Sequence, residues 1–101
     1  TLTNVDGLSN LTSVGGDLDI DNNAALVSLD GLSSLTSVGY YLTITNNNAL
    51  TDLDGLSSLT SVGGGLSILY NDSLCQSSVD VLVAACTIGA WTSVYGNNDG
   101  C

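Results

Sequence analysis

The sequence has no positively charged side chain. Among 101 residues there is no lysine, arginine or histidine, while ten aspartates give a formal charge of −10. Binding to nucleic acid and docking on anionic lipid both depend on Lys and Arg, so neither is expected. A catalytic site would also lack a histidine or lysine base and a cationic phosphate clamp. The sequence therefore predicts no enzyme and no cofactor.

Proline, phenylalanine and methionine are missing too, although 44% of the residues are hydrophobic. The core must therefore be built from many small contacts of Leu, Val, Ile and Ala. The longest apolar run, 81–86, is far shorter than the roughly 20 residues of a membrane helix, so no membrane insertion is expected. An acidic chain without cleavage sites for trypsin-like proteases fits an extracellular or cell-surface location.

In place of these features the sequence has a repeat of 24 residues. The ranges 1–24, 25–48 and 49–72 form three full units, and 73–101 departs from their pattern. Residues that recur at the same step of each unit include Gly7, Gly31 and Gly55, Leu18, Leu42 and Leu66, and Asn23, Asn47 and Asn71. We expect a solenoid in which each recurring residue forms a column.

Each unit contains one alternating segment. Leu18 and Ile20 alternate with Asp17, Asp19 and Asp21, the period of two expected of a strand with one buried face. Equivalent strands are expected at 41–45 and 65–69, stacked in parallel about 4.8 Å apart. Glycine pairs precede the first and third strands and predict sharp corners at Gly15, Gly16, Gly63 and Gly64, where a positive φ is cheapest without a Cβ. Tyr40 takes the second position of the pair in the second unit, so that position is expected to need only an open corner.

Two polar positions accompany every strand. The asparagine after each strand is expected to join a buried ladder, because its amide can bond the turn backbone and the next amide in line. That ladder comprises Asn23, Asn47 and Asn71. The aspartate before each Gly-Leu-Ser is expected to cap a short helical or 3₁₀ segment on the other side of the coil. These caps are Asp6, Asp30 and Asp54.

The pattern Leu-x-x-Val-Gly-Gly-x-Leu-x-Ile-x-Asn-Asn over residues 1–72 resembles the leucine-rich and receptor-L-domain-like repeats of bacterial surface and secreted proteins. The resemblance implies a leucine-rich-repeat-like solenoid with one parallel strand per 24-residue coil and a role in extracellular recognition, adhesion or structure. It carries no catalytic residue across.

Residues 73–101 are expected to form a C-terminal cap. Val79, Leu82 and Val83 fall at helical spacing after Ser77 and Ser78, which suit a helix start. A fourth strand is expected over 91–95, with Trp91 lying over the end of the array.

Three cysteines fall in this region. The repeat phase places Cys101 one coil beyond Cys75, a separation that a disulfide accepts, and leaves Cys86 as a buried thiol. A Cys75–Cys86 bridge, three free thiols or a bridge to another chain are the alternatives.

Other candidate sites are local. Asp17, Asp19 and Asp21 lie on one strand face and offer a weak calcium candidate, against which a solvated polar face is favoured. Asn10 begins a glycosylation motif, as does Asn71 of the ladder. Exposed surface contacts are expected at Tyr40 and Tyr41.

Two functions compete. Thr1 falls in phase with Ala25 and Ala49, so the first coil looks uncovered, and a bare solenoid end favours head-to-tail assembly of copies into a filament or surface layer. The alternative is an adhesion module whose strand face, with Thr43 and Ser67 among its residues, binds a protein or glycan.

Overall fold

The computed structural model describes residues 2–101, so the expectation about Thr1 lies outside the described residues. A 3₁₀ helix, a short strand and a longer strand recur in that order, until an α-helix takes the place of the 3₁₀ helix. The elements are η1 (Asp6–Leu8), β1 (Ser13–Val14), β2 (Leu18–Asp21), η2 (Asp30–Leu32), β3 (Ser37–Val38), β4 (Leu42–Thr45), η3 (Asp54–Leu56), β5 (Ser61–Val62), β6 (Leu66–Leu69), α1 (Gln76–Ala85), β7 (Thr87–Ile88) and β8 (Thr92–Tyr95).

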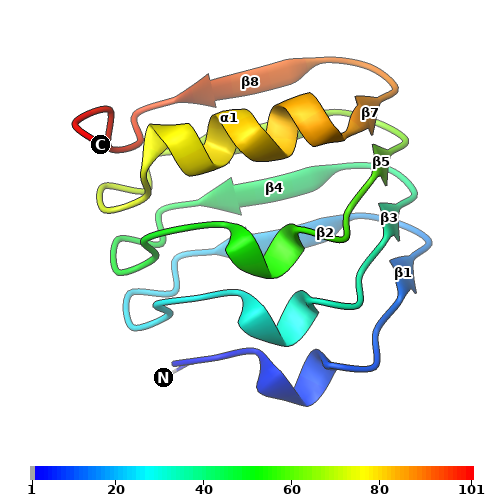
Figure 1. The fold of residues 1–101 in the computed structure, drawn as a ribbon, viewed down its shortest axis with the longest axis horizontal. Helices are drawn as coiled ribbons and strands as arrows, with labels where there is room; N and C mark the ends of the chain where they lie inside the picture. The colour runs from blue at the N-terminus through cyan, green and yellow to red at the C-terminus, as the bar shows by residue number, and fades with distance from the viewer. Residues whose placement is uncertain (1) are drawn as a thin grey trace.

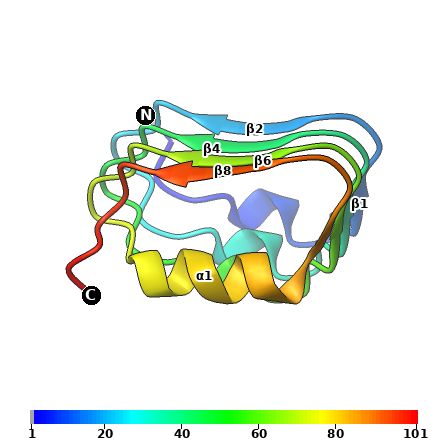
Figure 2. The ribbon, with the colours of Figure 1, turned by 90° about the horizontal axis from the view of Figure 1, so that it is seen from above.

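Two parallel sheets run through the stack (Figure 1). The long sheet has the order β2-β4-β6-β8 and the short sheet the order β1-β3-β5-β7. In Figure 2 the long sheet forms one side of the coils, the 3₁₀ helices and α1 form the opposite side, and the short sheet closes one end. The predicted solenoid-like repeat of parallel strands and 3₁₀ segments is confirmed. The short sheet has no signature in the sequence, because two residues cannot show a period.

The register places equivalent side chains in columns. Leu42 pairs with Leu18 below and Leu66 above, and Ile44 pairs with Ile20 and Ile68. Leu42, Leu66, Ile44 and Ile68 are wholly buried, whereas Leu18 in β2, the first strand of the long sheet, is only half-buried. Parallel strands thus form the inner wall of an aliphatic core whose opposite wall consists of leucines from the 3₁₀ side.

Helix α1 lies beside η3 on the side opposite the long sheet (Figures 1 and 2). It turns Val79 and Leu82 into the core, and the Ser78 hydroxyl accepts a hydrogen bond from the Leu53 backbone N–H at 2.9 Å. The predicted helix and fourth strand are both present. Because α1 is longer than a 3₁₀ segment, the last coil spans 26 residues between equivalent asparagines, against 24 in the earlier coils.

The first glycine of each corner does not adopt the positive φ that the sequence predicts, whereas the second position, occupied by Tyr40 in the second coil, needs no positive φ, as expected. A Cβ on Gly63 would lie 2.2 Å from the backbone oxygen of Gly39, so the corner needs a residue without a side chain because two backbones meet there. Among residues 2–101 the left-handed positions follow the long strands instead, and they are Asn22, Asn46, Tyr70 and Gly96.

The aspartate caps are also a wrong prediction. Asp6, Asp30 and Asp54 are the first residues inside the 3₁₀ helices, and no side chain makes a cap hydrogen bond there. The residue before each aspartate occupies the cap position, and Leu29 and Leu53 are buried there because the core needs an apolar side chain at that step. The three carboxylates are therefore left exposed to solvent.

An asparagine ladder runs through the interior. Asn47 Oδ1 accepts from the Asn23 backbone N–H at 3.0 Å and from Asn23 Nδ2 at 3.2 Å, while Asn47 Nδ2 donates to Ile20 O and to Asn71 Oδ1. Asn71 repeats this pattern onto Asn97. Asn47 and Asn71 are wholly buried, and each amide uses both of its acceptor positions and both donors.

Replacing Asn47 with alanine should lower the free energy of unfolding by roughly 3 kcal/mol, because Asn23 and Ile20 then lose their partners inside the protein. Urea unfolding followed by circular dichroism measures the change. Asn48→Ala is the matched control, since Asn48 is exposed and its side chain makes none of these bonds. Equal stability of the two variants would contradict a structural role for the ladder.

Candidate functional site

The solvent side of the long sheet, called here the outer sheet face, carries the residues that alternate with the buried columns. Backbone bonds from Leu18 to Tyr41, Leu42 to Gly65 and Leu66 to Trp91 extend the register to the residue before each strand. The face therefore consists of three columns across the strands, which are Asp17, Tyr41, Gly65 and Trp91, then Asp19, Thr43, Ser67 and Ser93, then Asp21, Thr45, Leu69 and Tyr95.

The end of this face at β2 is acidic. Asp17 Oδ1 accepts a hydrogen bond from the Tyr41 backbone N–H at 3.0 Å, and the Asp21 carboxylate accepts one from the Thr45 hydroxyl. Both carboxylates thus bond the next strand. Within residues 2–101 no three aspartates or cysteines converge as a metal site requires, so the calcium alternative for Asp17, Asp19 and Asp21 is not supported.

The opposite end of the face is aromatic. Trp91 lies over Gly65, where a Cβ would come within 2.4 Å of the indole, and its ring stacks on Tyr41 with centroids 5.8 Å apart and planes 26° apart. The sequence predicts Trp91 over the end of the array, but the missing side chain at Gly65 lets the indole lie on the preceding coil, just before β6. Trp91 and Tyr41 each remain about half exposed, at 50% and 46%.

A second aromatic pair lies at the other end of the same strands. Tyr70 and Tyr95 meet edge to face with centroids 5.3 Å apart, and both are about half exposed. Hydrogen bonding with the Tyr95 side chain, followed by the charge interaction between the two phenols, raises the pKa of Tyr70, so Tyr70 is neutral at physiological pH. Neither tyrosine is predicted from the sequence as a site residue. The longer last coil places Tyr95 in the column of Asp21, which a fixed period of 24 residues does not reveal.

Tyr40, the other expected contact residue, is 62% exposed at the corner before β4. It forms no ring contact with the aromatic residues of 2–101.

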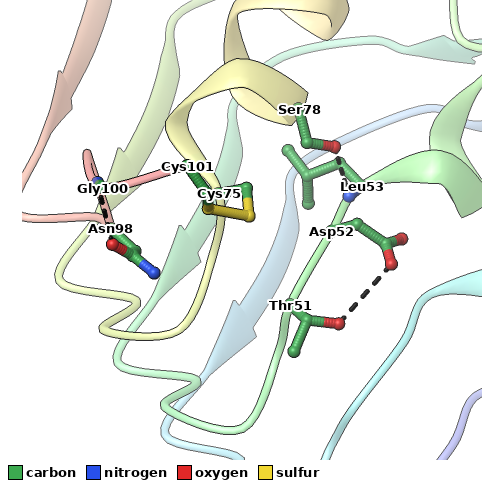
Figure 3. Close-up of a disulfide and its surroundings, with 8 residues drawn as sticks. All are labelled: Thr51, Asp52, Leu53, Cys75, Ser78, Asn98, Gly100 and Cys101. Carbon is green, nitrogen blue, oxygen red and sulfur yellow. Dashed lines mark hydrogen bonds between the residues drawn. A yellow bond between two sulfur atoms is a disulfide. The ribbon is translucent and has the colours of Figure 1, made fainter.

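The cysteines lie on the helix side, away from the outer sheet face. Cys75 and Cys101 form a disulfide with Cα atoms 5.5 Å apart, which ties the start of α1 to the last coil (Figure 3). Cys86 is a free thiol, half-buried, and its Sγ donates to Leu59 O at 3.3 Å. Burial raises the pKa of the Cys86 thiol, so its reactive thiolate is scarce at neutral pH.

The two glycosylation motifs differ in access. Asn10 is exposed in the turn after η1, whereas Asn71 is wholly buried in the ladder, where no glycan can be attached.

Two hollows lie on the helix side as well. One, of about 100 Å³, is lined mainly by apolar side chains of the η3 region and α1, together with Asp54, Ser57 and Ser78. That volume is well below the roughly 300 Å³ of a typical small-molecule site. The other is a wide, open depression beside the disulfide, where Thr51, Asp52 and Ser78 also lie (Figure 3). The outer sheet face is the surface that combines exposed aromatic rings with hydroxyl groups.

In the comparison with protein families, the model described as Receptor L domain matches residues 2–85. The chain belongs to the Receptor L domain family. No match was found among curated proteins, and none among solved structures. Receptor L domains are non-catalytic ligand-binding domains and are extracellular in receptors, so membership favours recognition over catalysis and gives no support to filament assembly.

In the described part of this Receptor L domain, no helix is long and apolar enough to cross a membrane.

Substituting Cys101 with serine should lower the free energy of unfolding by about 3 kcal/mol, because the bridge to Cys75 constrains a long loop of the unfolded chain. Urea unfolding without reductant measures this loss. Dithiothreitol should destabilise the wild-type chain by a similar amount and leave Cys101→Ser unchanged. A further loss in the reduced variant would contradict the Cys75–Cys101 pairing.

Proposed function

We propose that this Receptor L domain is an extracellular or cell-surface recognition module that binds its ligand on the outer sheet face. The observation that carries the proposal is a group of four half-exposed aromatic rings, with Tyr41, Trp91 and Tyr95 in the columns of that face and Tyr70 directly after β6, against Tyr95. Aromatic residues are enriched at the centres of binding surfaces because they bury a large area with few rotatable bonds.

The proposed module consists of three 24-residue coils, 1–24, 25–48 and 49–72, and a cap over 73–101. The repeat spacing of the asparagine bonds and the burial of Val79 and Leu82 against the last coil support this division. In this arrangement α1 shields the core columns on the helix side, while the long sheet continues into β8 and remains open as a surface.

Asn10 is the proposed glycosylation site. It follows η1 and so belongs to the side of the coil opposite the long sheet, where a glycan would leave the outer sheet face accessible.

Arginine in place of Ser67 tests the location of the ligand site. Ser67 lies in the middle column of the outer sheet face, so the added bulk and charge should weaken ligand binding at least about tenfold. Ser33→Arg is the matched control, because Ser33 is exposed directly after η2 on the opposite side. Labelled wild type and both variants are applied to an array of extracellular proteins and glycans.

Equal loss of signal in both variants, or no loss in Ser67→Arg, would rule out the outer sheet face as the ligand site. No signal for the wild type would count against recognition itself.

Head-to-tail assembly is a second proposal, and it rests on a different observation. In residues 2–101, β1 and β2 each have one unpaired edge, and Leu8 is 43% exposed although Leu32 and Leu56, in the same column, are wholly buried. An unpaired edge beside an exposed core column can accept another coil.

Sedimentation velocity over a range of concentrations tests assembly. If copies stack through this edge, the average mass should rise with protein concentration. In Leu8→Asn the same rise should need a protein concentration about ten times higher. Val27→Asn is the control, since Val27 is 55% exposed in a middle coil. A constant monomer mass at high concentration refutes the assembly proposal and leaves the recognition proposal intact.

A further inference from the structure

The aromatic half of the outer sheet face consists of two separate platforms. Trp91 with Tyr41 forms one, just before the strands, and Tyr70 with Tyr95 forms the other, at their ends. Trp91 and Tyr95 are four residues apart along β8, which corresponds to about 13 Å in an extended strand. A ligand that contacts both platforms must therefore be elongated along the strands.

The surface between the platforms is polar. Thr43, Ser67 and Ser93 form the middle column, pair in register from β4 to β8, and are each half-buried. Their hydroxyls can donate and accept hydrogen bonds. The aromatic rings are therefore two islands beside a row of hydroxyls, and not the continuous apolar centre that a protein partner usually covers.

The platform of Trp91 and Tyr41 has an exposed ring face because of the backbone beneath it. Gly65 has no side chain, so the indole of Trp91 lies directly on the sheet and presents a ring face to solvent. The Tyr41 ring stacks on the indole, with centroids 5.8 Å apart and planes 26° apart, so the two rings form one aromatic group. Exposed ring faces attract flat arrays of C–H groups through dispersion and burial of apolar area.

Charge decides which elongated ligands fit. The chain has no Lys, Arg or His, and Asp17, Asp19 and Asp21 lie on the same face. An anionic ligand would be repelled without any compensating cation, whereas uncharged hydroxyl groups can donate to the carboxylates.

We propose that the outer sheet face binds an uncharged saccharide chain laid along the strands, with one sugar ring on Trp91 and Tyr41 and another at Tyr70 and Tyr95. The sugar C–H faces contact the rings, and the sugar hydroxyls bond Thr43, Ser67 and Ser93. This inference rests on the proposed function, since it names the ligand class of the same face.

Titration with soluble hexasaccharides tests the inference. Cellohexaose, chitohexaose and mannohexaose are the uncharged probes, and a heparin hexasaccharide is the anionic one. Trp91 is the single tryptophan of the chain, so its fluorescence reports directly on the platform that it forms with Tyr41. At least one uncharged probe should change the fluorescence to saturation, and the heparin probe should not.

Variants measured by calorimetry with that probe locate the site. Trp91→Ala and Tyr95→Ala should each weaken binding at least about tenfold, the loss expected when one ring contact is removed. Tyr40→Ala is the matched control and should bind as wild type, since Tyr40 is exposed beside Tyr41 but outside both platforms. Circular dichroism confirms that each variant is folded.

Three binding results would overturn the proposal: no binding of any uncharged hexasaccharide, equal binding of the heparin probe, or unchanged binding by Trp91→Ala and Tyr95→Ala. A dimer that Trp91→Ala dissociates would also overturn it, because a second copy of the chain would then cover the platforms. If the sugars fail but a protein on the array binds wild type and Ser33→Arg, and not Ser67→Arg, the recognition function stands and only the saccharide class is wrong.

Discussion

The asparagine ladder is the interaction on which the rest of the structure depends. Each buried amide must satisfy two donors and two acceptors, and it does so only when the next coil presents its own asparagine at the same height. A long strand shifted by one residue against its neighbour would bury an unpaired amide and turn the alternating leucines and isoleucines outward. The ladder therefore fixes the register of the long strands. The leucine and isoleucine columns supply most of the burial, but apolar contacts alone have no direction and tolerate a shift.

Close stacking of the coils has a second consequence at the corners. Backbone meets backbone between Gly39 and Gly63, and a Cβ would collide with the carbonyl of the coil below.

The last coil shows that the length of a coil can vary on the helix side while the ladder and the long sheet stay in register. It is longer because α1 replaces a 3₁₀ helix, yet Asn97 still bonds Asn71 and β8 still pairs with β6. The extra residues are absorbed on the helix side, where no ladder is interrupted, and the long sheet keeps its order. That order brings Trp91 onto Gly65 and Tyr95 against Tyr70.

The sequence predicts the features that depend on period and misses those that depend on neighbours. The long strands and the columns follow from recurrence every 24 residues, and α1 follows from the helical spacing of Val79, Leu82 and Val83. The role of the aspartates does not follow from spacing, since Asp30 and Asp54 have the local signature of a cap but buried leucines occupy the cap position. At this position, packing of the core outweighs the preference of aspartate for the cap. The position of the Trp91 side chain depends on the missing side chain at Gly65 in the coil below. The sequence around Trp91 does not show that a glycine lies beneath it.

The absence of positively charged side chains explains why the outer sheet face offers aromatic rings and hydrogen-bonding groups to a ligand. All ten carboxylates must remain solvated because no cation exists to pair with them, and nine are exposed while Asp52 is half-buried. Ligand recognition on such a surface cannot draw on ion pairs with a cationic side chain of its own. It must come from ring contacts and hydrogen bonds, and the outer sheet face supplies both in separate places. Asp17 and Asp21 already bond the neighbouring coil, whereas the four aromatic rings remain about half exposed and can contact a ligand.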